Sequence, residues 1–318
     1  MPLSPAPPGS FTIAVLPDTQ GYPARHPEIF YREIEWILAH REQQRIVFVS
    51  HVGDLVEDNA PEQWPVAIRA MSKLDGVLPY GISPGNNDMD AKKGDSSLFC
   101  VMFPARHFKR RPWYGGHYHD NANSYQLLDV TLPEDAPDGW RGRTLRFVLL
   151  HLECNAPDDR LAWADRVLRK HARRQAIITT HMFLGPIHKP QRPTGYFTDP
   201  KGVMQWVRCH GRNGNTPQQL WDKCFRRHPN VILILAGDQS RTQTFHMTLT
   251  GDAGNPVHAC MSDYRDGWFR LYRFLPRQGS IRVITLNAVT GTLCQGTPVV
   301  PDRSAHQFTL PWNPENPI

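Results

Sequence analysis

Short apolar runs rich in β-branched residues alternate with amphipathic segments over most of the chain. The runs are apolar throughout, as in strands buried on both faces of a sheet, and the segments between them have the spacing of helices with one apolar face. We expect strands at 11–17, 45–53, 77–82, 144–153, 175–181 and 231–238, and helices at 27–43, 61–75, 158–172 and 216–228. Strands that alternate with helices form sheets covered by helices, so the pattern predicts an α/β fold.

From about residue 242 the pattern changes to consecutive strands joined by glycine-rich turns. This mainly β part predicts an antiparallel region or a second sheet. No linker separates it from the preceding residues, so we expect one domain over 11–318, after a flexible, proline-rich N-terminus at 1–10. We expect loops through most of 83–130 and across 185–215.

Composition narrows the class of protein further. The chain has 318 residues, of which 40% are hydrophobic, enough for a sizeable core, and no run approaches the length of a membrane span. The net charge of +6 favours an anionic partner, but the basic residues are scattered and no motif predicts sequence-specific nucleic-acid binding. The six cysteines contain no C-x-x-C pair, so we expect free thiols and no structural zinc. The first residues do not resemble a signal peptide, and both a soluble cytoplasmic and a secreted protein stay open.

Polar side chains follow five of the expected strands. These are Asp18, Asp54, the group Asn86, Asn87 and Asp88, then His181, and finally Asp238. In open α/β sheets the functional crevice lies outside the carboxyl ends of the strands, so we expect these side chains to meet there. Carboxylates gathered in one crevice repel each other, and a bound cation removes that repulsion. Oxygen and imidazole ligands together suit Mn, Fe or Zn.

The order of these motifs resembles that of the calcineurin-like metallophosphoesterase family. The chain has D-T-Q (18–20), G-D-L-V-E (53–57), G-N-N-D (85–88), His181 and G-D-Q-S (237–240), where the family has D-x-H, G-D-x-x-[DE], G-N-H-[DE], a lone His and G-H-x-H. The resemblance implies a sandwich of two mixed β-sheets flanked by helices. It also implies two metals bridged by Asp54, with Asp18 and Gln20 on the first metal and Asn86, His181 and Asp238 on the second.

Four histidines of the family pattern are replaced in this chain. Gln20, Asn87, Asp238 and Ser240 stand in their places. By the resemblance, the first metal site is weakened and the second is largely intact, so we expect one or two divalent ions. Asn87 has no proton to give to a leaving group near neutral pH, whereas a histidine does.

We therefore expect a metal-dependent hydrolase that cleaves a phosphate mono- or diester with a metal-activated water, acting on a phosphorylated or otherwise anionic small molecule. Asp54, Asn87 and Arg241 are the candidate catalytic residues, and Arg241 can hold a phosphate bidentately. His188 is a further candidate for substrate binding or an ordinary loop residue. Two alternatives stay open: a non-hydrolytic metalloenzyme, for example with redox chemistry at one iron, and a metal- or anion-binding module with weak catalysis.

Two further histidines have a simpler interpretation. His51 and His151 lie inside expected strands, and we interpret both as packed strand residues rather than metal ligands.

Overall fold

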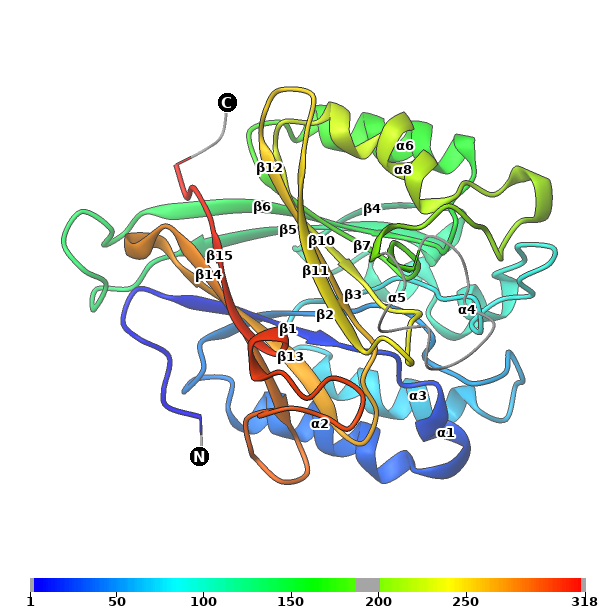
Figure 1. Cartoon of the computed structure of the whole chain (residues 1–318), viewed down its shortest axis with the longest axis horizontal. Coiled ribbons are helices and arrows are strands. Elements are labelled where there is room, and N and C mark those ends of the chain that lie inside the picture. The colour runs from blue at the N-terminus through cyan, green and yellow to red at the C-terminus, as the bar shows by residue number, and fades with distance from the viewer. Residues whose placement is uncertain (1–2, 187–200, 316–318) are drawn as a thin grey trace.

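Two β-sheets face each other in the computed structural model, which describes residues 3–186 and 201–315 (Figure 1). The first sheet has the strand order β15-β14-β13-β1-β2-β3, and the second has the order β11-β12-β10-β7-β6-β5-β4. The strands of the first sheet are β1 (Phe11–Leu16), β2 (Ile46–His51), β3 (Tyr80–Ile82), β13 (Trp268–Leu275), β14 (Ser280–Asn287) and β15 (Gln307–Pro311). Those of the second are β4 (Tyr114–Tyr118), β5 (Asn123–Thr131), β6 (Thr144–Leu152), β7 (Gln175–Thr180), β10 (Val231–Ala236), β11 (Thr244–Thr250) and β12 (Pro256–Ser262).

Both sheets are mixed, and their parallel strands fix where the polar strand ends lie. In the first sheet β1, β2 and β3 are parallel neighbours. In the second sheet β6, β7, β10 and β12 run parallel to one another. Because the carboxyl ends of parallel strands meet at one edge of a sheet, residues that follow these seven strands lie on two facing edges. This confirms the predicted α/β sandwich of two mixed sheets.

Helices cover the outer face of each sheet (Figure 1). They include α1 (Gly21–Arg25), α2 (Pro27–Ala39) and α3 (Trp64–Met71) on the first sheet and α6 (Asp158–Lys170) and α8 (Pro217–Lys223) on the second, with the short α4 (Ser97–Met102) and α5 (Ala105–Phe108) after β3. One apolar cluster, which includes Phe11, Phe48, Phe147 and Leu235, fills the space between the sheets, and two others lie beneath the helices. The strands are therefore apolar on both faces, as their sequences indicate.

The α8 helix shows how the sequence sets a helix boundary. Thr216 is its N-cap and accepts a hydrogen bond from the backbone N–H of Gln219, whose side chain in turn accepts one from the N–H of Thr216. Pro217 occupies the first helical turn, where no N–H partner is needed. The helix begins where the Thr-Pro pair predicts, but it is shorter than expected and is followed by a 3₁₀ turn at Phe225–Arg227.

The expectation of loops through most of 83–130 is wrong for its second half. Strands β4 and β5 lie there and form the edge of the second sheet. β5 buries polar residues inside the fold: Asn123 donates to Glu153 Oε1 over 2.9 Å, and Gln126 donates to Ser124 over 3.1 Å. Since buried polar groups are tolerated when they are hydrogen-bonded, this strand lacks the apolar pattern that reveals the others.

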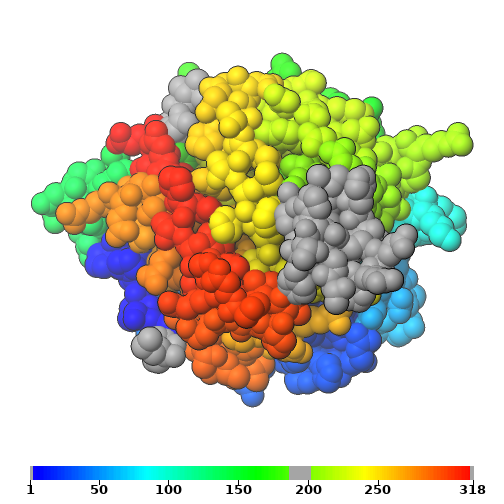
Figure 2. All heavy atoms as spheres, viewed as in Figure 1, coloured from blue at the N-terminus to red at the C-terminus, as the bar shows by residue number. Residues whose placement is uncertain are grey.

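The C-terminal part contributes strands to both sheets rather than forming a separate layer. β11 and β12 extend the second sheet, whereas β13, β14 and β15 extend the first. Figure 2 shows the β11–β12 region (yellow) and the C-terminal segment (orange to red) beside each other on one face. The division into a flexible N-terminus and one domain stays a prediction.

The structure also bears on two expectations drawn from composition. All six cysteines are free, and five of them are buried. Among the described residues, the helices are too short and too polar for any of them to cross a bilayer.

Candidate metal centre

Asp18, Asp54 and His181 meet at the facing edges of the two sheets. They follow β1, β2 and β7, respectively, and one ligand atom from each lies within 4.8 Å of the others. His181 Nε2 is 3.2 Å from Asp54 Oδ2, and His181 Nδ1 is 3.8 Å from Asp18 Oδ1. All three side chains are buried. Residues far apart in the sequence are thus placed together by the parallel strands that precede them.

The His181 ring is oriented as a metal-binding imidazole requires. Its Nδ1 lies 3.1 Å from the carbonyl oxygen of Val52, and a carbonyl can only accept, so Nδ1 carries the proton of this hydrogen bond. Nε2 faces Asp54 and Asp238 and has no hydrogen-bond partner within the described residues. A hydrogen bond from the second ring nitrogen to a carbonyl is the usual way in which a ligating histidine is fixed.

Two of the acidic residues have backbones in the left-handed region. Asp54 has φ of 52° and Asp238 has φ of 64°, values that aspartate tolerates better than most residues but that are uncommon. Glycines beside them allow close approach: a Cβ on Gly85 would overlap Asp54 Oδ1, and one on Gly237 would overlap Asp18 Oδ1. The glycines in the strand-end motifs therefore leave room for the carboxylates, since glycine has no Cβ.

Asp88 is fully buried and connects the loops after β2 and β3. One carboxylate oxygen accepts the N–H groups of Leu55 (2.8 Å) and Val56 (3.2 Å), and the other accepts the N–H of Gly85 (2.8 Å). Burial, followed by the charge of Asp54, raises the pKa of Asp88 to about 7. Its oxygens are engaged by backbone donors, so Asp88 orients the loops that hold Asp54 and Asn86.

A cavity of about 250 Å³ opens above this group. Most of the residues that the motifs single out line it, and it also contains three residues that the sequence reasoning missed. The expected residues are Asp18, Gln20, Asp54, Asn86, Asn87, Asp238, Ser240 and Arg241, and the missed ones are Arg208, Gln239 and Asp263. His181 lies buried beneath them, whereas His188 lies outside the described residues.

Asp263 was missed although it follows the same rule as the others. It comes directly after β12, which runs parallel to β10, so it reaches the same edge. Its Oδ1 is buried without a hydrogen-bond partner in the described part of the chain. Burial raises the pKa of Asp263 to about 7. Burial, and then the charge of Asp263, raises the pKa of Asp18 well above its usual range.

The electrostatics of the group favour positive charge. Burial is also the main reason why the pKa of Asp238 is raised. Burial by itself would lower the pKa of His181, but the carboxylates of Asp54 and Asp18 outweigh it and raise that pKa well above its usual range. A cation placed among these groups would stabilise the charged carboxylates that burial and mutual repulsion disfavour.

Two of the four positions where the resemblance predicts missing histidines, Gln20 and Asn87, contact each other. Asn87 Nδ2 donates to Gln20 Oε1 over 2.5 Å, and Asn87 Oδ1 accepts from Asn86 Nδ2 over 2.7 Å. The backbone N–H of Asn87 donates to Asp54 Oδ1 over 2.8 Å. Asn87 is therefore fixed at the rim of the cavity by amide contacts, and Gln20 turns its oxygen toward Asn87.

The interpretation of His51 and His151 as packed residues is confirmed. His51 contacts Thr19 Oγ1 through Nε2 (3.1 Å) and accepts the N–H of Gly53 at Nδ1 (3.1 Å), while His151 Nε2 contacts Ser50 Oγ (2.9 Å). Burial lowers the pKa of each to about 3, so both rings are neutral.

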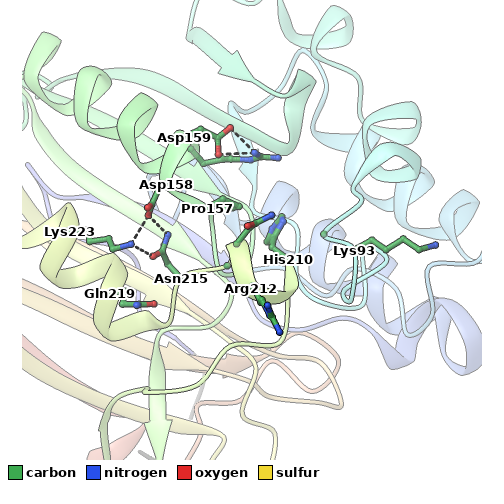
Figure 3. A pocket seen from close by; sticks show the side chains of 13 residues that line it. Lys93, Pro157, Asp158, Asp159, His210, Arg212, Asn215, Gln219 and Lys223 are labelled. Atoms are coloured by element: carbon green, nitrogen blue, oxygen red, sulfur yellow. Dashed lines mark hydrogen bonds and ion pairs between the residues drawn. The ribbon is translucent and has the colours of Figure 1, made fainter.

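A larger cavity, of about 480 Å³, lies beside α6 and α8 (Figure 3). Its charged side chains pair mostly with each other: Lys223 contacts Asp158 over 2.7 Å, and Arg160 contacts Asp159 over 2.7 Å (Figure 3). In the described ranges, the compact group of potential metal ligands is the one at Asp18, Asp54 and His181, not one in this cavity. The smaller cavity is therefore the candidate site.

The residues present fit a divalent metal ion. Asp18 Oδ1, His181 Nε2 and Asp263 Oδ1 are buried polar atoms without hydrogen-bond partners among the described residues, and all three belong to potential metal ligands. Such atoms are costly unless a partner such as a metal ion binds them. The donors are oxygen and imidazole nitrogen, which suits Mn, Fe or Zn better than a soft ion.

A two-sheet α/β sandwich with an acidic, histidine-containing group at its strand ends defines a class of metal-binding proteins. Residues 11–239 match the family model "Calcineurin-like phosphoesterase", and the chain belongs to this family of metal-dependent phosphoesterases. It is also 28% identical over 288 residues to the uncharacterized protein YvnB of Bacillus subtilis strain 168. That match covers 86% of this chain but 20% of YvnB, so the chain spans about a fifth of the length of this curated relative.

Solved structures are similar at low identity. The chain matches GAP50, described as the anchor in the inner membrane complex of Plasmodium, with a TM-score of 0.49 and 11% identity, covering 96% of this chain and 89% of GAP50. It matches the NAD nucleotidase of Haemophilus influenzae with a TM-score of 0.44 and 11% identity, covering 84% of this chain and 53% of the nucleotidase.

Proposed function

We propose that this protein is a metal-dependent phosphoesterase that hydrolyses a phosphate mono- or diester of a small molecule. The observation that carries the proposal is the buried group of Asp18, Asp54 and His181 beneath a cavity that two arginines also line. The acidic group attracts a cation, and the arginines attract the anionic phosphate. Membership of the phosphoesterase family supports the same reaction.

The residues that the motifs single out have the following roles in this proposal. Asp18, Asp54 and His181 hold the ion, with Asn86, Asp238 and the amide of Gln20 as further donors within reach of the cavity. A divalent ion such as Mn, Fe or Zn supplies Lewis-acid chemistry for the attack of water on phosphorus. Arg241 binds phosphoryl oxygens and stabilises the charge that develops on them. His188 stays a candidate for substrate binding.

Asn87 sets the choice of leaving group. A well-placed general acid contributes roughly 10²–10⁴-fold to such reactions, and an asparagine supplies no proton. Aryl oxides leave without that help more readily than alkoxides. The preferred substrates are therefore esters whose leaving group is stable as an anion.

The test combines metal analysis with a substrate panel. The protein is supplied with Mn²⁺, Fe²⁺ or Zn²⁺ and assayed on aryl phosphate mono- and diesters. We expect bound metal and phosphate or alcohol release, both abolished by Asp54→Ala. Asp138→Ala is the matched control, since the Asp138 side chain is 92% exposed at the surface, and it should change neither result.

The outcomes separate the proposed function from its alternatives. Less than about half an equivalent of metal, unchanged in Asp54→Ala, would refute the metal site. Metal binding with anion binding but no hydrolysis would indicate a binding module instead. Turnover that depends on oxygen or a reductant, without phosphate release, would indicate redox chemistry at the same residues.

A further inference from the structure

Arg208 enters the candidate metal centre from a segment outside the family motifs. It lies between β9 (Lys201–Val203) and α8, and its Nη1 donates to Asp238 Oδ1 over 2.8 Å and to Asn86 Oδ1 over 3.1 Å. Asp238 follows β10 and Asn86 follows β3. One guanidinium nitrogen therefore bridges two ligand-type oxygens that come from the two different sheets.

These two oxygens belong to residues that the family pattern gives to a second metal. The resemblance also gives His181 to that second metal and Asp18 to the first, whereas Asp18, Asp54 and His181 lie together in this structure. We propose that the guanidinium of Arg208 occupies the part of the centre at Asn86 and Asp238, so that the two metals of the family pattern are reduced to one divalent ion, held by Asp18, Asp54 and His181. This inference rests on the proposed function, because it concerns how many ions the same centre holds.

The aspartate at position 238 supports the proposal that Arg208 replaces a metal ion there. The family pattern has histidine there, and a neutral imidazole that binds a metal cannot form an ion pair with arginine. Aspartate can, and the Asp238 side chain, at 3% exposure, needs a compensating charge. An aspartate in place of the family's histidine is therefore what allows Arg208 to form an ion pair at this position.

The segment that carries Arg208 is held in position from both sides. Asn155 lies in the loop after β6, and its Oδ1 accepts the backbone N–H groups of Arg208 (3.0 Å) and Cys209 (3.3 Å). The guanidinium also lies over the Trp206 ring, 4.9 Å from its centroid. After Cys209, the backbone N–H of His210 donates to the carbonyl oxygen of Ala91 over 3.0 Å. These contacts therefore hold the Arg208 side chain at the site.

A guanidinium and a metal ion differ in what they can do for the reaction. Both attract phosphoryl oxygens, and Arg208 keeps Nη2 and Nε, which have no hydrogen-bond partners among the described residues, for that purpose. Arginine cannot acidify a water molecule as a metal ion does, because a guanidinium is not a Lewis acid to which the water oxygen can coordinate. Asp18, Asp54 and His181 would hold the single ion, which would supply the Lewis-acid chemistry, while Arg208 would hold the phosphate as a fixed positive charge.

The test counts ions in the full chain. Purified protein is titrated with Mn²⁺, bound metal is measured by mass spectrometry, and electron paramagnetic resonance distinguishes isolated Mn²⁺ from spin-coupled pairs. We expect about one ion per wild-type chain without spin coupling. Arg208→Gln frees Asp238 and Asn86 and should raise the count toward two, with a coupled signal. Arg212→Gln, on the same segment but lining the other cavity, should stay at one.

Each result bears on the inference. Two coupled ions in the wild-type chain would overturn it and leave the proposed function intact. A folded Arg208→Gln variant that still binds one uncoupled ion would also overturn it, with folding checked by circular dichroism. If that variant fails to fold, the wild-type titration decides alone. A wild-type chain that binds no Mn²⁺ would overturn the proposed function and this inference with it.

Discussion

Gly85→Ala is the sharpest test of how the strand-end loops position the metal ligands. A Cβ at residue 85 would overlap Asp54 Oδ1 and also the backbone nitrogen of Asp54, so a change of side-chain rotamer at Asp54 cannot relieve the clash. Gly85 also donates its N–H to Asp88 over 2.8 Å. The substitution therefore pushes apart the loops after β2 and β3.

The size of the effect follows from this geometry. Forcing an extra methyl group into a packed interior costs about 1–3 kcal/mol. An unfolding entropy of about 2.1 cal/mol/K per residue gives roughly 0.7 kcal/mol/K for the whole chain, so the expected loss in Tm is about 1.5 to 4.5 °C. Displacing residues that orient a metal ligand costs roughly 10–100-fold in metal affinity, and we expect a loss of this order for Mn²⁺.

Gly202→Ala is the matched control, because none of the described residues has an atom within 4 Å of a Cβ at that position and its backbone φ is not in the left-handed region. Differential scanning calorimetry gives Tm and isothermal titration calorimetry gives the Mn²⁺ affinity. If Gly85→Ala matches Gly202→Ala in both, the close approach of Gly85 to Asp54 does not hold the site together and the reasoning is refuted.

Three further changes test other parts of the structure. Asn87→His should raise activity on alkyl phosphates by up to about 10²-fold and change aryl phosphates less, because it restores a proton donor, and no change in that ratio would contradict this role. Asp263→Asn should weaken Mn²⁺ binding measured by titration calorimetry, since its unpartnered buried oxygen faces the centre. Burial raises the pKa of Glu33, so folding favours its neutral form. As pH rises above about 5, wild-type stability therefore falls by up to about 1.4 kcal/mol per pH unit until the folded-state pKa is reached. Glu33→Gln removes this titration, so the variant should become increasingly more stable than wild type over the same pH range. Thermal unfolding of wild type and variant at pH 5 and pH 8 gives that difference, and an equal Tm shift at both values would contradict it.

The parts of the fold that sequence predicts are those with a single dominant pattern. β1, β7 and β10 are buried throughout and centred on apolar runs, and their predicted ranges lie within a residue or two of the observed limits. β5 was not, because its buried Asn123 and Gln126 are stabilised by partners that only the folded chain brings together. The hydrophobic pattern of a sequence indicates which strands are buried in apolar surroundings. It does not indicate polar residues that are buried with hydrogen-bond partners, because those partners come from elsewhere in the folded chain.

The same distinction explains which site residues were found. Asp18, Asp54, Asn86 and Asp238 follow strands whose ends are visible in the sequence. Asp263 also follows a strand, but it lies in the part taken as a simple β meander, and nothing in the sequence shows that β12 runs parallel to β10. Arg208 carries no such signal, since it comes from an irregular segment and reaches the site only through the contacts of Asn155.

The charge balance of the cavity ties these residues together. Four carboxylates line it, those of Asp18, Asp54, Asp238 and Asp263, and so do two arginines, Arg208 and Arg241. In the proposed arrangement, one divalent ion and the two arginines would supply four positive charges, which would balance the four carboxylates once the bound ion has displaced their protons. A second divalent ion would leave an excess of positive charge at a site that already has two cationic side chains. In the proposed arrangement Asp238 stands where the family pattern has a histidine, and Arg208 supplies the positive charge beside it.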